Sequence, residues 1–98
     1  MNDAETVEIL NVLQPGKTYR VNKAKFEAMK LAVLKVLPKS AQGMSVADLG
    51  KGVLPHLPQS LFPGGATSGW WVKAVQLDLE ARNIIGRTKT KPLRLHKI

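Results

Sequence analysis

Apolar residues recur every three or four positions in three stretches of the chain, and this spacing predicts three amphipathic helices. The first predicted helix spans residues 23–37, between Asn22, a favourable N-cap, and Pro38, which cannot continue a helix. Lysines occupy much of its remaining surface, so we expect one buried face and one solvated face. The buried face comprises Phe26, Met29, Val33 and Leu37.

The second and third predicted helices are marked by residues at their ends as well as by their spacing. The second begins after the capping residue Ser45 and ends before Pro55. The third spans residues 69–82 and has the clearest pattern, with Thr67 or Ser68 as its cap. The turn between these two helices is longer than the three or four residues that are usual in a helix-turn-helix.

Two stretches near the C-terminus alternate between apolar and polar residues. Residues 84–88 and 93–98 flank a turn at residues 89–92, which predicts an antiparallel β-hairpin. Residues 1–21 read as an irregular arm with room for one short edge strand. The sequence therefore predicts a mainly α-helical α+β fold, with the arm preceding a single domain at residues 22–98.

The junction between the third helix and the hairpin carries a family resemblance. Leu79-Glu80-Ala81-Arg82-Asn83-Ile84-Ile85-Gly86-Arg87 resembles the segment that joins the recognition helix to the wing in MarR-like and related winged-helix proteins. Asn83 stands where that segment has a glycine, and asparagine tolerates a positive φ. The Gly-Trp-Trp stretch and the Lys-Pro-Leu-Arg-Leu ending are similar to small bacterial winged-helix families of unknown function. The resemblance implies a winged helix-turn-helix with a three-helix core and a C-terminal wing.

Positive charge is concentrated in two parts of the chain. The net charge is +8, residues 15–39 hold seven Lys or Arg against one Glu, and residues 84–98 hold five with no acid. Charge clustered in this way favours an anionic partner such as nucleic acid.

The resemblance implies that the third helix enters the DNA major groove and that the wing contacts the backbone. The positions that match are basic or hydroxyl residues of the wing and one lysine of the helix: Arg87, Lys89, Lys91, Arg94, Lys73, Thr88 and Thr90. We therefore expect binding of duplex DNA through phosphate contacts, which supply most of the affinity for a duplex. The alternative for the wing is a solvated, charged hairpin that keeps an edge strand from aggregating.

The third helix also carries a second apolar stripe, nearly opposite the one that faces the core. Its members are Trp70, Ala74, Leu77 and Ala81. A helix with two apolar stripes is usually packed on both sides, so the N-terminal arm (Ile9, Leu10 and Leu13) or a second protein chain must cover this one. The alternative function is therefore a protein–protein interaction or dimerisation module with no nucleic-acid role.

Three side chains of the third helix raise more specific expectations. Asp78 and Glu80 would repel phosphate. One of the two adjacent tryptophans is expected to pack on the core beside Phe62 and the other under the N-terminal arm. Packing is the favoured interpretation for Trp71, whereas for Trp70 packing, base stacking and an interface role all stay open.

Residues for catalysis or for metal binding are not indicated. The chain has no cysteine, and its two histidines, His56 and His96, are far apart with no suitably spaced partner ligands. No apolar run approaches the roughly 18 residues of a membrane span. We therefore expect a cytoplasmic, non-enzymatic protein without metal or cofactor.

Overall fold

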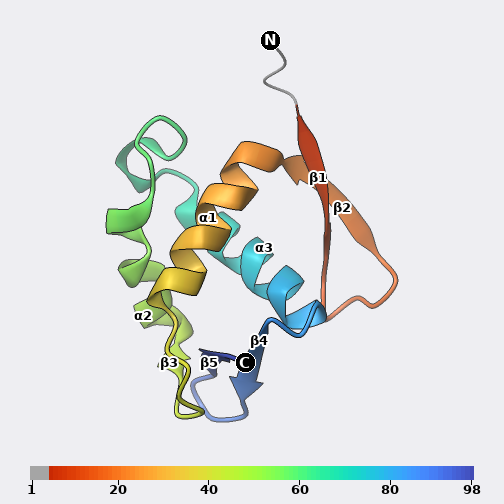
Figure 1. Cartoon of the computed structure of the whole chain (residues 1–98), viewed down its shortest axis with the longest axis vertical. Coiled ribbons are helices and arrows are strands. Elements are labelled where there is room, and N and C mark those ends of the chain that lie inside the picture. The colour runs from red at the N-terminus through yellow and green to blue at the C-terminus, as the bar shows by residue number, and fades with distance from the viewer. Residues whose placement is uncertain (1–4) are drawn as a thin grey trace.

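The structure is a computed structural model, and it describes residues 5–98. It contains three α-helices and two small antiparallel sheets, which confirms the predicted α+β class (Figure 1). The elements follow in the order β1 (Thr6–Leu10), β2 (Thr18–Asn22), α1 (Lys23–Val36), β3 (Met44–Ser45), α2 (Val46–Gly52), η1 (Leu54–His56), η2 (Pro63–Gly65), α3 (Ser68–Ala81), β4 (Ile85–Thr88) and β5 (Arg94–Lys97).

The helix ends follow from side-chain chemistry at two of the three N-termini. The Asn22 side chain accepts a hydrogen bond from the Lys25 backbone N–H at 2.9 Å, and Ser45 Oγ accepts one from the Asp48 N–H at 3.1 Å. Thr67 precedes α3 with a φ of 61°, but its hydroxyl donates to the Ala66 carbonyl at 2.6 Å instead of capping the helix. The sequence predicts a regular side-chain N-cap at α3, and this prediction is therefore wrong.

The core lies where the first apolar stripes of the helices meet. The predicted face of α1 is buried throughout, Leu49 and Val53 close the α2 side, and Phe62 joins them from the loop before α3. The α3 contribution comes from one stripe: Trp71, Val72, Val75 and Leu79. Sixteen buried apolar residues form this single cluster, so residues 5–98 share one core.

The C-terminal sheet has the strand order β3–β5–β4, with both pairings antiparallel. The β4–β5 hairpin pairs Ile85 with Lys97 and Thr88 with Arg94, as the alternating pattern predicts. Ile85 and Leu95 are buried, and they cover the side of the core that the helices leave open. Strand β3 was not predicted, because two residues are too few to show an alternation.

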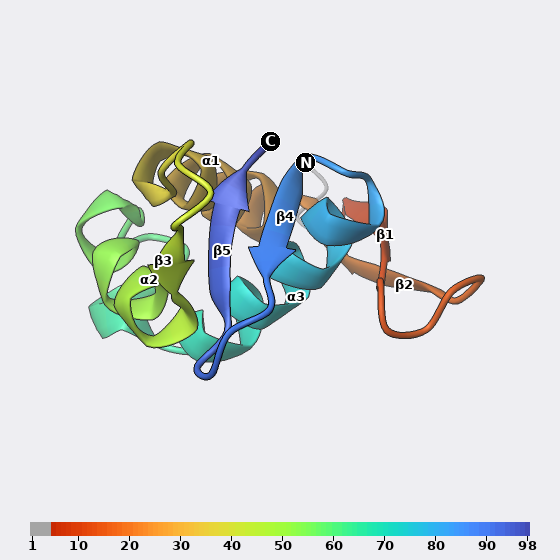
Figure 2. The ribbon, with the colours of Figure 1, turned by 90° about the horizontal axis from the view of Figure 1, so that it is seen from below.

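The N-terminal arm is a second hairpin in which β1 and β2 pair along five residues each. The sequence predicted one strand here, because consecutive apolar residues after Ile9 obscure the alternation of β1. Ile9 is 4% exposed and belongs to the core cluster, so the hairpin is anchored to the domain. Figure 2 shows this hairpin beyond one edge of α3, with the C-terminal sheet along the other.

Candidate nucleic-acid interface

The loop between β4 and β5 presents two lysines to solvent. Lys89 and Lys91 are exposed, and within residues 5–98 neither forms an ion pair with a carboxylate. The loop is shaped by Thr90, whose N–H donates to the Thr88 carbonyl at 2.8 Å and whose hydroxyl donates to the Pro92 carbonyl at 2.7 Å. A loop tip held from within in this way places its lysines for contact with an external anion.

Arg87 lies in β4, shortly before the same loop, and has a partner inside the protein. Its Nε lies 2.5 Å from Glu80 Oε1 and its second nitrogen donates to Oε2 at 3.0 Å. The hydrogen bond to Glu80 raises the pKa of Arg87, against the lowering effect of burial, and the Coulomb attraction of Glu80 adds to it. The structure thus places Arg87 as a link between β4 and α3, with its charge compensated.

The remaining predicted wing residues fasten the sheet to the turn before β3. Arg94 Nε donates to the Gln42 carbonyl at 2.7 Å, and its Nη2 donates to the Gly43 carbonyl at 2.9 Å. The Thr88 hydroxyl donates to the Ala41 carbonyl at 2.6 Å. Both side chains are therefore occupied, although the positive charge of Arg94 is not neutralised by these neutral carbonyls.

The second apolar stripe of α3, which we call the outer stripe (Trp70, Ala74, Leu77 and Ala81), is partly covered by the N-terminal hairpin. Leu77 is only 8% exposed, and the Val12 N–H donates to the Leu77 carbonyl at 3.3 Å. Leu13, which the sequence assigned to this cover, is 61% exposed and takes no part. The cover that the outer stripe requires is thus supplied by the chain itself at the C-terminal half of α3.

The two acidic residues of α3 do not face solvent. Asp78 is buried, accepts the Leu10 N–H at 2.8 Å and pairs with Arg82 at 3.0 Å. Glu80 is paired with Arg87 and also accepts a hydrogen bond from Gln76 Nε2 at 2.9 Å. The expectation that these carboxylates repel phosphate is therefore corrected: cations neutralise both of them inside the domain.

A groove remains open between the N-terminal hairpin and the first turns of α3. It has a volume of about 320 Å³, and its surface is mostly apolar. We call it the hairpin groove; it is lined by Ile9, Leu10, Asn11, Tyr19, Arg20, Val21, Trp70, Lys73, Ala74 and Leu77.

The two aromatic residues of the hairpin groove are both exposed and both held in place. Trp70 is 58% exposed, and its ring meets that of Trp71 edge-on at 5.0 Å between centroids. Tyr19 is 42% exposed, and its hydroxyl donates to Gln14 Oε1. Trp71 is buried, as expected from the sequence, and it is the tryptophan that contacts Phe62, at 6.4 Å between ring centroids.

The charged residues at the hairpin groove are both basic. Lys73 is exposed and has no carboxylate partner among the described residues. Arg20 lies 4.0 Å from Glu8, an exposed pair that contributes little, and its guanidinium donates to Thr6 Oγ1 at 3.3 Å. The basic residues from Lys17 to Lys30, Arg20 among them, could from the sequence form a second phosphate-contacting face, although a solvated surface was the preferred interpretation. Tyr19 was missed, although the strand pattern of residues 18–21 places Tyr19 and Val21 on one face.

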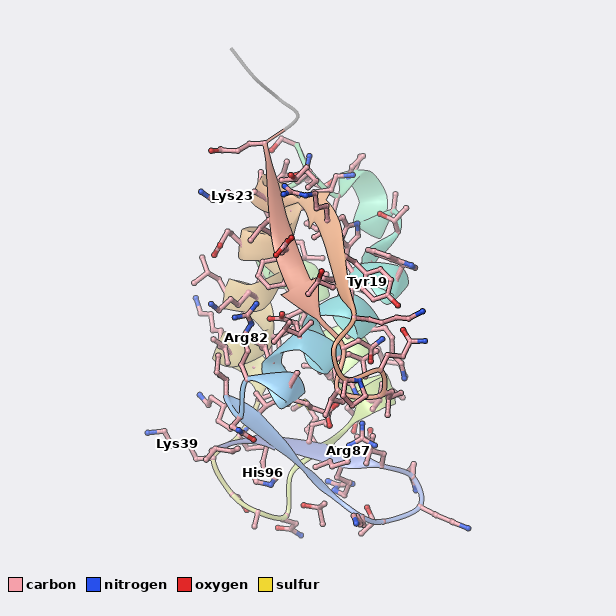
Figure 3. The ribbon with its side chains drawn as sticks, turned by 90° about the vertical axis from the view of Figure 1, so that its right-hand side faces the viewer. Tyr19, Lys23, Lys39, Arg82, Arg87 and His96 are labelled. Atoms are coloured by element: carbon pink, nitrogen blue, oxygen red, sulfur yellow. The ribbon has the colours of Figure 1, made fainter. Side chains whose placement is uncertain are left out.

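The predicted residues thus fall into two groups. Lys73, Lys89 and Lys91 are exposed and unpaired within the described part of the chain, whereas Arg87, Arg94, Thr88 and Thr90 bind neighbouring protein atoms. Figure 3 shows Tyr19 and the β4–β5 loop projecting toward the same side of the molecule, with Lys39 on the opposite side.

No group of three or more metal-ligating side chains occurs among residues 5–98. Over the same residues, no helix combines the length and apolarity that crossing a membrane requires. Comparison with known proteins gives one match, to residues 6–95, described as a family of unknown function (DUF6958). No curated protein and no solved structure matches the chain.

Proposed function

The chain belongs to the family of unknown function DUF6958, and we propose that it is a cytoplasmic winged-helix domain that binds duplex DNA through phosphate contacts. The phosphate-binding residues are Lys89 and Lys91 of the β4–β5 loop, the wing, together with Lys73 of α3. The observation that carries the proposal is the loop tip, which presents two exposed lysines that have no carboxylate partner among residues 5–98. Neutralising phosphate charge supplies most of the affinity of a non-specific DNA-binding protein.

The order of elements supports the winged-helix assignment. Three helices are followed by a β-hairpin, and that hairpin packs against α3 as the resemblance implies for a wing. The long turn between α2 and α3 contains η2, so the helix-turn-helix is extended here.

The same geometry argues against reading of paired bases by α3. Base readout needs polar side chains that reach the groove edges, yet every residue from Val75 to Glu80 is buried. Only the first turns of the helix are open, and Lys73 is their single charged side chain. Binding of duplex DNA by this chain is therefore tolerant of sequence.

The alternative function, a dimerisation module, has less support in the structure than in the sequence. A dimer was considered because the outer stripe requires cover, and the N-terminal hairpin covers the C-terminal half of that stripe. We therefore propose no second chain on α3.

The proposal is tested by titrating a labelled random-sequence duplex at about 50 and 200 mM salt and following fluorescence anisotropy. Three phosphate contacts predict a loss of about 40-fold in affinity across that range. The double variant Lys89→Gln/Lys91→Gln should reduce the salt dependence to that of about one contact and weaken binding about 100-fold at the lower salt.

The matched control is Lys35→Gln/Lys39→Gln, which removes the same charge from two exposed lysines in and just after the last turn of α1. Figure 3 shows Lys39 on the side opposite the β4–β5 loop. It should leave most of the affinity intact. If the two double variants weaken binding equally, net charge alone attracts the DNA and the wing has no special role.

A further inference from the structure

Two exposed aromatic rings line the hairpin groove from different elements. Tyr19 lies on β2 and Trp70 on α3, with 42% and 58% of their surfaces exposed. Single exposed apolar residues are normal on a protein surface, but two rings beside one apolar groove mark a contact site. The buried Trp71 packs edge-on against Trp70 and so orients that ring, and the Tyr19 hydroxyl donates to the exposed Gln14 side chain.

The charge at the groove is complementary to an anion. No acidic residue lines it, and its charged residues are Lys73, which has no carboxylate partner among residues 5–98, and Arg20, which lies 4.0 Å from Glu8. The occupant therefore combines a flat apolar face, which the rings and the aliphatic floor favour, with a negative charge that reaches Lys73. A nucleic-acid strand has both parts, a base and its phosphate.

We propose that the hairpin groove holds an unpaired base of a nucleic-acid strand, stacked on Trp70 and flanked by Tyr19, with the adjacent phosphate at Lys73. The inference rests on the proposed function, because it takes nucleic acid to be the ligand, and it narrows that ligand to a strand with unpaired bases next to duplex. Figure 3 shows Tyr19 and the β4–β5 loop toward the same side of the molecule.

Stacking on Trp70 requires a base that has left the stack of a duplex. The space is about 320 Å³, and the hairpin forms one wall of it while α3 forms the other. A base that has left its partner presents a free face and edge, and stacking on an aromatic side chain is worth a comparable amount for every base.

The groove offers little to distinguish one base from another. Asn11 is its one amide side chain, and Asn11 Oδ1 already accepts the Leu13 N–H at 2.8 Å. Recognition at this site therefore depends on stacking and charge, which are tolerant of sequence.

The test compares a labelled oligothymidylate of about ten nucleotides with an abasic strand of the same length and phosphate count. At about 50 mM salt the protein should bind the strand with bases roughly 5- to 150-fold more tightly than the abasic one. Trp70→Ala should remove that preference and leave affinity for the abasic strand unchanged, whereas Trp70→Phe should retain it. Leu31→Ala, which removes a 71% exposed side chain from α1, is the control and should change neither affinity.

Each result decides between the two proposals. Equal affinity for the two strands, or a Trp70→Ala variant that loses affinity for both alike, overturns the base-binding inference and leaves the wing proposal standing. If the protein prefers the strand with bases but Lys89→Gln/Lys91→Gln does not weaken its binding of nucleic acid, the base-binding inference is supported. The wing proposal is then overturned. Absence of binding to either strand and to duplex overturns both, and the groove then belongs to a protein partner.

Discussion

The N-terminal hairpin β1–β2 and the C-terminal hairpin β4–β5 both pack against α3, but they are fastened by different means. The first is joined mainly through its backbone, as the Leu10 and Val12 N–H groups donate to acceptors on α3. The second is joined through the side-chain pair between Arg87 and Glu80. Arg20 of the first hairpin lies 4.0 Å from the Glu8 carboxylate, while the lysines at the tip of the second have no carboxylate partner among residues 5–98.

This difference teaches where the useful charge of a basic protein lies. Arg87 and Arg94 of the C-terminal hairpin are bound to protein atoms and hold the strands in place. Lysines at the β4–β5 tip bind nothing in the described structure and so remain available. The net charge of +8 therefore overstates the positive charge that an external anion meets, because part of that charge is bound within the fold.

The largest expected effect concerns the side-chain fastener of the C-terminal hairpin. Arg87→Met removes the partner of the buried Glu80 carboxylate and should lower the free energy of unfolding by about 3 kcal/mol. Urea denaturation measures this loss. Removing both partners, in Glu80→Leu/Arg87→Met, should restore most of the stability, because no unpaired charge is then buried.

The pH dependence of the parent protein checks the same pair. Interaction with Glu80 raises the pKa of Arg87 above its ordinary value, so the stabilisation is complete below that value and is lost only as pH rises through the higher pKa of the folded state. Titration of Arg87 should therefore cause no loss of stability between about pH 6 and 9. A fall in stability over that interval that disappears in Arg87→Met would contradict this account.

The second effect concerns the apolar anchor of the N-terminal hairpin. Ile9→Ala leaves a cavity where a 4% exposed side chain enters the core, and it should cost about 2 kcal/mol. Leu13→Ala, in the loop of the same hairpin, removes a side chain that is 61% exposed and should cost less than about 0.5 kcal/mol. Equal losses in urea denaturation would mean that the loop, and not β1, fixes the hairpin.

The third expected effect distinguishes two interactions of Asp78 on α3, the hydrogen bond from the Leu10 N–H and the ion pair with Arg82. Asp78→Asn keeps an oxygen that accepts the Leu10 N–H but removes the charge that pairs with Arg82, so it should cost about 1 kcal/mol. Hydrogen exchange of the Leu10 amide is the local measurement. Protection should persist in Asp78→Asn and fall in Asp78→Ala, and unchanged protection in both would remove Asp78 from the account of how the hairpin is held.

The sequence predicted those parts of the molecule that depend on near neighbours. The helices and the β4–β5 hairpin follow from local spacing and turn residues, and the structure has them within about one or two residues of the expected ends. The second apolar stripe correctly indicated that something covers α3. The hairpin groove could not be predicted, because it depends on contacts such as that between Leu10 and Asp78, which are 68 positions apart. The role of Arg87 was missed because pairing with Glu80 becomes visible only when β4 lies beside α3.

The smallest expected effect on stability makes the comparison of the two hairpins useful for function. Lys89 and Lys91 are exposed and have no carboxylate partner in the described chain, so Lys89→Gln/Lys91→Gln should change the free energy of unfolding by less than about 0.5 kcal/mol. Urea denaturation should therefore give the parent midpoint, while binding of duplex DNA falls about 100-fold at low salt. Arg20→Gln on the first hairpin should instead change the free energy of unfolding slightly as well as DNA binding, because that guanidinium contacts Glu8 and Thr6. If the lysine variants unfold at a clearly lower urea concentration, the tip of the β4–β5 hairpin supports the fold after all, and its two lysines are not free for an external anion.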